Sequence, residues 1–352
     1  MAILSGIQAN SFSFALGVLS TAITVSSYDT SKSILFFSHR GAHTDRSANL
    51  FIMGQKSDST TLFFQKTSSG QASTVLWNLA SFSEGISVQE GTTDLVKEVT
   101  SNVVIIAVDS RKTFLFYTIM SSDTTSGNFD NNESFRGFLT TPTNLLFTRQ
   151  GGSGGVISWQ VVEYEGCTVQ SGTGNLSTDS LNLVLNIPIA VDTSKTALFV
   201  NNDHFQAVSR ISNMGQMPQF VNQTTILIQR DSAAKNANIV HWQTVEFGDG
   251  TSVQSNTAYF GTGTLSSDMT LKWFSSSRAI PMVGSPYQFL GKGGAGQPGD
   301  FSFGNISFTV ALLGNTGLRV ERGLGILNSC NLFYQVVEFN SQPREEPYII
   351  FA

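Results

Sequence analysis

The sequence predicts an all-β protein built from four tandem β-sandwich-like repeats of about 83 residues each. Three observations carry this prediction. An aromatic marker recurs at spacings of 82 and 83 residues, two shorter markers recur in step with it, and runs rich in Phe, Val, Ile and Thr alternate with Ser, Thr, Asn and Gly turns. Such runs suit a pleated, half-buried surface, so we expect them to be strands.

The first marker is an aromatic residue that opens a short repeated stretch. It reads Trp-Gln-Val-Val-Glu-Tyr from Trp159, Trp-Gln-Thr-Val-Glu-Phe from Trp242 and Tyr-Gln-Val-Val-Glu-Phe from Tyr334, and a diverged copy starts at Trp77. Four copies of one unit are therefore expected.

The second and third markers keep the same register. A Val-Gln or Ile-Gln pair ends at Gln8, Gln89, Gln170 and Gln254. An Asp-containing turn ending in Lys follows at Asp29, Asp109 and Asp192, and Ser275 to Arg278 takes its place in the last copy. An Asp at the first turn position can accept a hydrogen bond from the amide two residues on, so we interpret this marker as a turn before a strand.

The units are expected to span residues 1–86, 87–168, 169–252 and 253–340, followed by a tail at 341–352. The fourth unit is diverged and carries a Gly-rich insertion. In the first unit, strands are predicted near 33–37, 49–53, 61–65 and 74–77. About six strands in a unit of this length is the size of one small β-sandwich.

Composition narrows the function classes. A net charge of −5, a pI near 5.4 and only 13% charged residues leave no basic footprint for nucleic acid or a membrane surface. Cys167 and Cys330 match no metal or redox spacing. No Lys or Arg precedes Lys32, so we expect no signal peptide and synthesis in the cytosol.

A basic residue precedes each aromatic marker by ten to twelve positions. These residues are Lys66, Arg149, Arg230 and Arg322. If the two segments form a hairpin, each cation would lie over the aromatic ring of its own repeat, for example Arg149 over Trp159. The alternative for the repeated aromatic residues is an exposed platform for sugars.

A carboxylate recurs at Glu163, Glu246 and Glu338. Strand alternation places Glu163 on the same face as Trp159, with Gln160 and Tyr164 on the other face. General acid–base catalysis would require a partner carboxylate, which the spacing does not supply. We therefore interpret these residues as partners of a neighbouring turn or of the repeated cations.

The sequence favours no catalytic, cofactor-binding or metal-ligating residue, so we expect a protein that is not an enzyme and has no cofactor. The histidines at 39, 43, 204 and 241 form no metal spacing. The only weak candidate for an enzyme site is the segment with Asp123, Asp130 and Glu133.

The repeated Trp159 to Glu163 stretch and the Val88-Gln-Glu-Gly-Thr92 stretch resemble repeats of structural proteins of tailed bacteriophages. The resemblance extends over nearly the whole chain and implies a virion structural protein: a capsid decoration protein, a collar or head-fibre protein, or a tail component. Its partners would be other virion proteins and copies of itself, with neither nucleic acid nor a membrane. The alternative function is a receptor- or glycan-binding adhesin made of tandem sandwiches.

Two segments of the last unit are candidate interfaces. One is the Gly-rich stretch at 284–304, and the other is the tail, which pairs a charged stretch with the apolar residues Tyr348, Ile349, Ile350 and Phe351. An apolar end of this kind would suit docking onto the sheet edge of a neighbouring subunit.

Overall fold

The regular structure of this protein is β-strand, with one short 3-10 helix, η1 (Thr30–Lys32), in the part described. The computed structural model describes residues 1–41, 51–67, 72–95, 100–121, 135–149, 155–204, 216–230, 237–283, 291–293, 307–323 and 329–341. The all-β prediction is confirmed.

Within the described residues, each unit contributes six strands in the same order, and the fourth unit adds a seventh. Unit one contains β1 (Ile3–Phe14), β2 (Ser20–Thr24), β3 (Ser33–Arg40), β4 (Ile52–Asp58), β5 (Thr61–Lys66) and β6 (Ser73–Glu84). Unit two contains β7 (Ile86–Asp94), β8 (Thr100–Val104), β9 (Thr113–Ser121), β10 (Arg136–Thr141), β11 (Asn144–Thr148) and β12 (Gly155–Tyr164). Unit three contains β13 (Cys167–Leu176), β14 (Asn182–Asn186), β15 (Thr196–His204), β16 (Met217–Asn222), β17 (Thr225–Gln229) and β18 (Asn238–Phe247). Unit four contains β19 (Ser252–Phe260), β20 (Ser266–Thr270), β21 (Ala279–Val283), β22 (Gly291–Gly293), β23 (Phe308–Leu313), β24 (Gly317–Arg322) and β25 (Cys330–Glu338).

The strands of each unit form two antiparallel sheets. The inner sheets have the orders β1-β6-β3, β7-β12-β9, β13-β18-β15 and β19-β25-β21, with β22 also paired to β25. The outer sheets have the orders β2-β5-β4, β8-β11-β10, β14-β17-β16 and β20-β24-β23. Four β-sandwich-like repeats are therefore present.

The connections between units are short turns that return directly into the next inner sheet. They occupy residue 85, residues 165–166 and residues 248–251. The expected unit ends at 86, 168 and 252 consequently lie one or two residues inside β7, β13 and β19. Gly85, Gly166 and Gly250 have positive φ in these turns, where a side chain would be strained.

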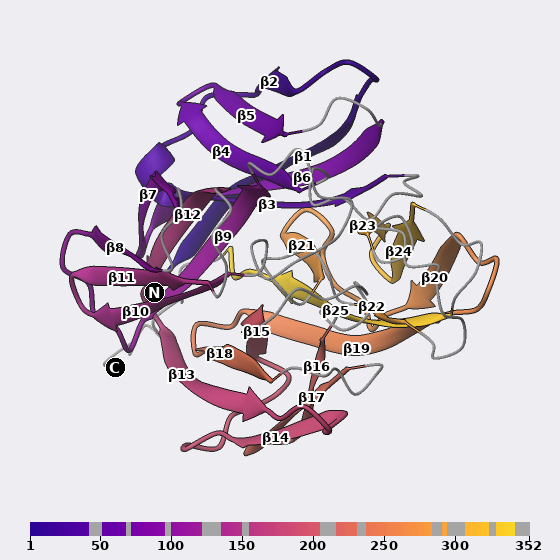
Figure 1. Ribbon diagram of the computed structural model, residues 1–352. Helices are drawn as coiled ribbons and strands as arrows, with labels where there is room; N and C mark the ends of the chain where they lie inside the picture. Colours follow the sequence, from indigo (N-terminus) through magenta and orange to yellow (C-terminus); the bar gives the residue numbers. More distant parts are fainter. Residues whose placement is uncertain are drawn as a thin grey trace, which may run out of the picture.

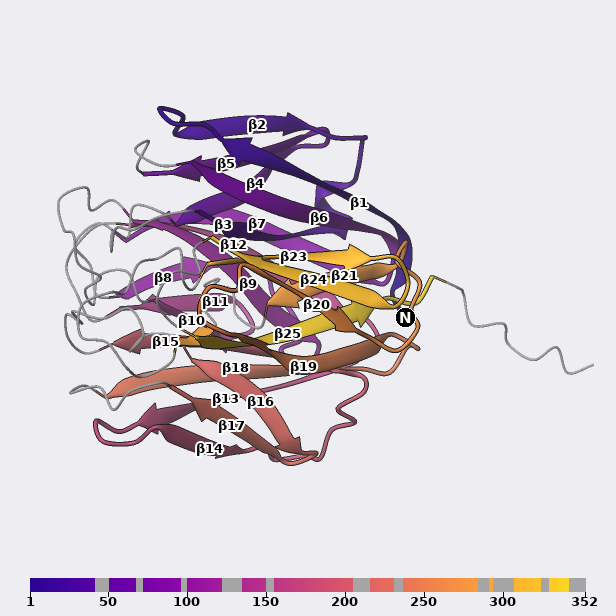
Figure 2. The ribbon, with the colours of Figure 1, turned by 90° about the vertical axis from the view of Figure 1, so that its right-hand side faces the viewer.

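The four units surround a common centre in chain order (Figure 1), and their strands run along the axis of the resulting ring (Figure 2). All four inner sheets turn one face to this centre. The equivalent positions Ile34, Phe114, Ala197 and Ile280 belong to one buried cluster, which we call the central core. The units are therefore joined by a shared core in addition to the cores inside their sandwiches.

The central core contains a closed ring of four aromatic side chains, one from each unit. This aromatic quartet consists of Phe82, Tyr164, Phe247 and Phe339. Neighbouring ring centroids are 5.8, 5.3, 6.3 and 5.3 Å apart in the order 82–164–247–339–82, and all four contacts are edge-to-face. Each such pair adds about 0.5–1.5 kcal/mol beyond the apolar area that it buries.

Strand alternation explains how one strand serves both cores. Trp159 and Val161 of β12 point into the sandwich core of unit two, whereas Val162 and Tyr164 point into the central core. The predicted facing is confirmed. Gly91 lies opposite Trp159 in β7, and a Cβ there would be 2.6 Å from the indole ring, so the Gly of the Val-Gln-Glu-Gly-Thr stretch makes room for the tryptophan.

We predict that Phe339→Ala destabilises the whole ring by about 3–5 kcal/mol, since it removes one member of the aromatic quartet and leaves a cavity. Denaturant unfolding measures this change. The control is Trp273→Ala, which removes an aromatic residue that is 67% exposed and should cost less than about 0.5 kcal/mol. Equal effects of the two substitutions would contradict the role of the quartet.

Candidate functional site

The repeated aspartates cap turns as the sequence predicts. The amides of Ser31, Arg111 and Ser194 donate to Oδ1 of Asp29, Asp109 and Asp192 over 2.9, 3.0 and 3.0 Å. Hydrogen bonds to Ser31 and Ser194 lower the pKa of Asp29 and Asp192, and Arg111 lowers the pKa of Asp109 to about 2. These carboxylates have a structural role.

The repeated glutamates bind the same turns from the neighbouring strand. Oε1 of Glu163, Glu246 and Glu338 accepts a hydrogen bond from the amide of Asp109, Asp192 and Ser275, over 3.0, 2.7 and 3.0 Å. The interpretation of these glutamates as turn partners is confirmed.

The expected contact between the repeated cations and the aromatic markers is wrong. Arg149 follows β11 of the outer sheet, whereas Trp159 lies on β12 of the inner sheet, so the two segments do not form a hairpin. The basic side chains lie instead over phenylalanine rings: Lys66 over Phe14 at 5.0 Å, Arg149 over Phe135 at 5.6 Å and Arg322 over Phe260 at 5.6 Å.

The buried arginines also bind the backbone carbonyls that follow the first strand of their unit. Arg149 donates to the carbonyl of Leu95, Arg230 to those of Ser177, Thr178 and Ser180, and Arg322 to those of Gly261 and Thr264. A buried guanidinium requires several acceptors, and these turns supply them.

The glutamine of the second marker binds backbone through both its amide nitrogen and its amide oxygen, an interaction that we call a Gln clamp. The spacing of the marker did not predict it. Each side-chain amide both donates to and accepts from the backbone of a single residue 17 to 19 positions later. Gln8 holds Ser26, Gln89 holds Ile106, Gln170 holds Ile189 and Gln254 holds Lys272. The segment between the second and third strands of each unit is thereby fixed.

A second set of glutamines joins neighbouring units. Gln160 exchanges two hydrogen bonds of 2.9 Å with the amide and carbonyl of Leu35 in unit one, and Gln335 does the same with Leu198 in unit three, over 2.7 and 2.8 Å. The amide of Leu115 donates to Gln243 over 3.1 Å. The Gln that follows the aromatic marker therefore fixes three of the four junctions.

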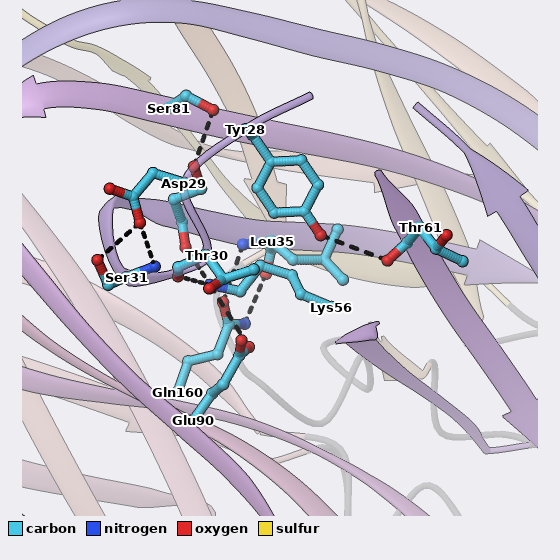
Figure 3. A network of polar contacts seen from close by, with 11 residues as sticks. Tyr28, Asp29, Thr30, Ser31, Leu35, Lys56, Thr61, Ser81, Glu90 and Gln160 are labelled. Carbon is cyan, nitrogen blue, oxygen red and sulfur yellow. Dashed lines mark hydrogen bonds and ion pairs between the residues drawn. The ribbon is translucent and has the colours of Figure 1, made fainter. Parts of the chain in front are cut away.

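The junction of units one and two contains in addition a buried ion pair (Figure 3). The Lys56 ammonium lies 3.4 Å from the Glu90 carboxylate and donates to the carbonyls of Thr30 and Ser33. Burial lowers the pKa of Lys56 and raises that of Glu90, and their mutual attraction opposes both shifts. The registers place the apolar residues Leu139, Phe220 and Leu312 at the position of Lys56 in the other units.

The junction of units four and one lacks the glutamine clamp. Asn78, one methylene shorter, stands at the position of Gln160, and Pro281, which has no N–H, stands at the position of Leu35. These two residues line a cleft of about 520 Å³ between β1 and β6 on one side and β21 and β23 on the other. Binding sites for small molecules have volumes of about 300–1,000 Å³.

Hydrogen bonds and an ion pair close the ring beside this cleft. The amide of Val310 donates to Ser38 over 3.2 Å, and the amide of Gly41 donates to Ser307 over 3.3 Å. Arg40 and Glu321 form an ion pair of 3.0 Å at the edge of the cleft.

The remaining candidates from the sequence are the histidines, the two cysteines and the segment with Asp123, Asp130 and Glu133. Within the described ranges, no cluster of three or more His, Cys, Asp or Glu side chains could hold a metal ion, and no helix is long and apolar enough to span a membrane. Cys167 and Cys330 are buried and are not joined in a disulfide, and burial raises the pKa of Cys167 to about 12. His43, Asp123, Asp130, Glu133 and the tail residues Tyr348 to Phe351 lie outside the described residues.

We predict that Gln335→Ala lowers the free energy of unfolding by about 2–4 kcal/mol, because it leaves the buried amide and carbonyl of Leu198 without partners. The matched control is Gln254→Ala, whose backbone partner Lys272 is exposed to water and should make the loss less than about 1 kcal/mol. Urea denaturation of both variants checks this difference, and a reversed order would contradict the clamp.

His241 predicts a pH dependence of stability. It is buried, stacks on Phe138 of unit two at 5.2 Å, and has its pKa lowered to about 3 by burial and by Arg136. Because the folded-state pKa lies below the unfolded value of 6.5, the folded state loses stability as the pH falls from about 6.5 to about 3.

Between pH 7 and pH 5, the free energy of unfolding should therefore fall by about 2 kcal/mol less in the His241→Gln variant than in the wild-type protein. Denaturation curves of both proteins at the two pH values measure this difference. Identical pH dependence of the two proteins would show that His241 does not stay neutral in the fold.

No protein-family model matches the chain, and no curated protein is similar to it in sequence. The resemblance to bacteriophage structural proteins therefore stays a prediction.

Proposed function

We propose that this chain is a non-enzymatic structural protein of a bacteriophage virion, which acts by assembling with copies of itself and with neighbouring virion proteins. The proposal combines the sequence resemblance with one observation: in units two to four, an apolar side chain is exposed at the residue whose backbone a Gln clamp holds or at the residue next to it.

The exposed side chains belong to the clamped segments. Ile106 is 77% exposed and Ile189 is 65% exposed, and both are the residues whose backbone the Gln clamps hold. In unit four the clamped residue is Lys272, and the next residue, Trp273, is 67% exposed. Exposed apolar residues on fixed backbone lose little conformational entropy on association, which favours a binding surface.

These segments lie towards one end of the ring. Gln89 pairs with Val161, three residues before Tyr164 of the aromatic quartet, and Gln170 and Gln254 have the same position relative to Phe247 and Phe339. We call the surface formed by Ile106, Ile189 and Trp273 the apolar end. Its repetition around the ring supports stacking against another ring-shaped partner or copy.

The full chain is expected to form an ordered assembly larger than the 38.0 kDa monomer. Light scattering with negative-stain images of the same peak measures this. The triple variant Ile106→Asp, Ile189→Asp, Trp273→Asp should be monomeric with unchanged thermal stability, since exposed positions contribute little to folding.

Leu16→Asp is the matched control, because Leu16 is 69% exposed and follows β1 at the end of that strand opposite to Phe82, in the unit that contributes no residue to the apolar end. It should leave the assembly intact. The proposal is overturned if the triple variant still assembles. It is also overturned if the wild-type chain stays monomeric both alone and with virion components.

A further inference from the structure

The cleft between units four and one lies at positions where, in the junction of units one and two, long side chains join the two units. In the junction of units one and two, Lys56, Glu90 and Gln160 reach across to the neighbouring unit. The equivalent residues here are Leu312, Ala9 and Asn78, and all three line the cleft. The replacements that are particular to this junction are Asn78 for the clamping glutamine and Pro281 for its leucine partner, because an apolar residue also stands at the Lys56 position in units two and three.

The cleft is lined by polar residues of the kinds that form hydrogen bonds with the hydroxyl groups of a ligand. The uncharged polar residues that line it are Asn10, Ser11, Thr74, Asn78, Ser276 and Ser277. Amides and hydroxyls both donate and accept hydrogen bonds, as ligand hydroxyls do. Arg40 and Glu321 are the only charged residues in its described lining, and they neutralise each other.

Apolar surface faces these groups across the cleft. Pro281, Val310 and Leu312 of unit four line it together with Ala9 of β1. Trp77 also borders the cleft, while its indole packs in the sandwich core of unit one. A ligand with hydroxyls on one side and C–H groups on the other would match both surfaces.

We propose that this cleft binds a neutral saccharide. The balanced charge disfavours phosphorylated and acidic ligands, the hydroxyl and amide groups supply pairwise hydrogen bonds, and the apolar wall takes the C–H face of a sugar ring. The site is independent of the assembly proposed above, because it lies at a junction inside one chain and does not use the apolar end.

The test uses the full chain and a panel of neutral and anionic oligosaccharides, with binding followed by saturation-transfer NMR and titration. Ala9→Trp places an indole in the cleft from an exposed position of the edge strand β1. The matched control is Ser171→Trp, the same strand position in unit three and also exposed. Thermal unfolding of both variants verifies that each is folded.

We expect a neutral saccharide to bind. Ala9→Trp should weaken this binding at least about tenfold, and Ser171→Trp should leave it unchanged. A second closing variant, Ala9→Glu with Leu312→Lys, reproduces the residue types of the closed junction and should abolish binding as well. The proposal is overturned if no panel member binds, if only anionic saccharides bind, or if the two tryptophan variants bind alike. None of these results depends on the oligomeric state.

Discussion

The edge-to-face contact of four aromatic rings is the interaction on which the rest of this structure depends. The four rings come from the last strand of each unit: Phe82 lies two residues before the end of β6, Tyr164 and Phe247 end β12 and β18, and Phe339 follows β25. They meet where the four inner sheets converge. Because each ring contacts the next, the positions of all four units are set together. Tyr164 adds a hydrogen bond of 2.8 Å from its hydroxyl to Asp249, in the turn that leads into unit four.

Polar clamps make this arrangement specific. Apolar packing alone would tolerate sliding of one inner sheet over the next, whereas a glutamine that pairs with both backbone groups of Leu35 or Leu198 permits a single register. A buried amide left without a partner costs about 1–3 kcal/mol, so slipped arrangements are disfavoured. The one junction without a clamp is also the one that contains the large cleft.

Local features could be predicted from the sequence, and long-range ones could not. The Asp109 turn, the facing of Trp159 and Tyr164, and the turn-binding role of Glu163 all follow from spacing within about one strand or turn. The clamp from Gln160 to Leu35 joins residues 125 positions apart, and no periodicity encodes it. The Arg149 prediction failed because consecutive strands were assumed to pair, whereas in a sandwich they can belong to opposite sheets. The cleft depends on Asn78 and Pro281 meeting at the closure of the ring, which the repeat alone does not specify.

The central claim is that the four units form one closed structure held by a shared core. Scanning calorimetry of the full chain tests it most directly, through the ratio of the van't Hoff enthalpy to the calorimetric enthalpy. A single transition with a ratio near one, shifted as a whole by Phe339→Ala, is the predicted result. Separate transitions for individual units, of which only one responds to that substitution, would contradict it.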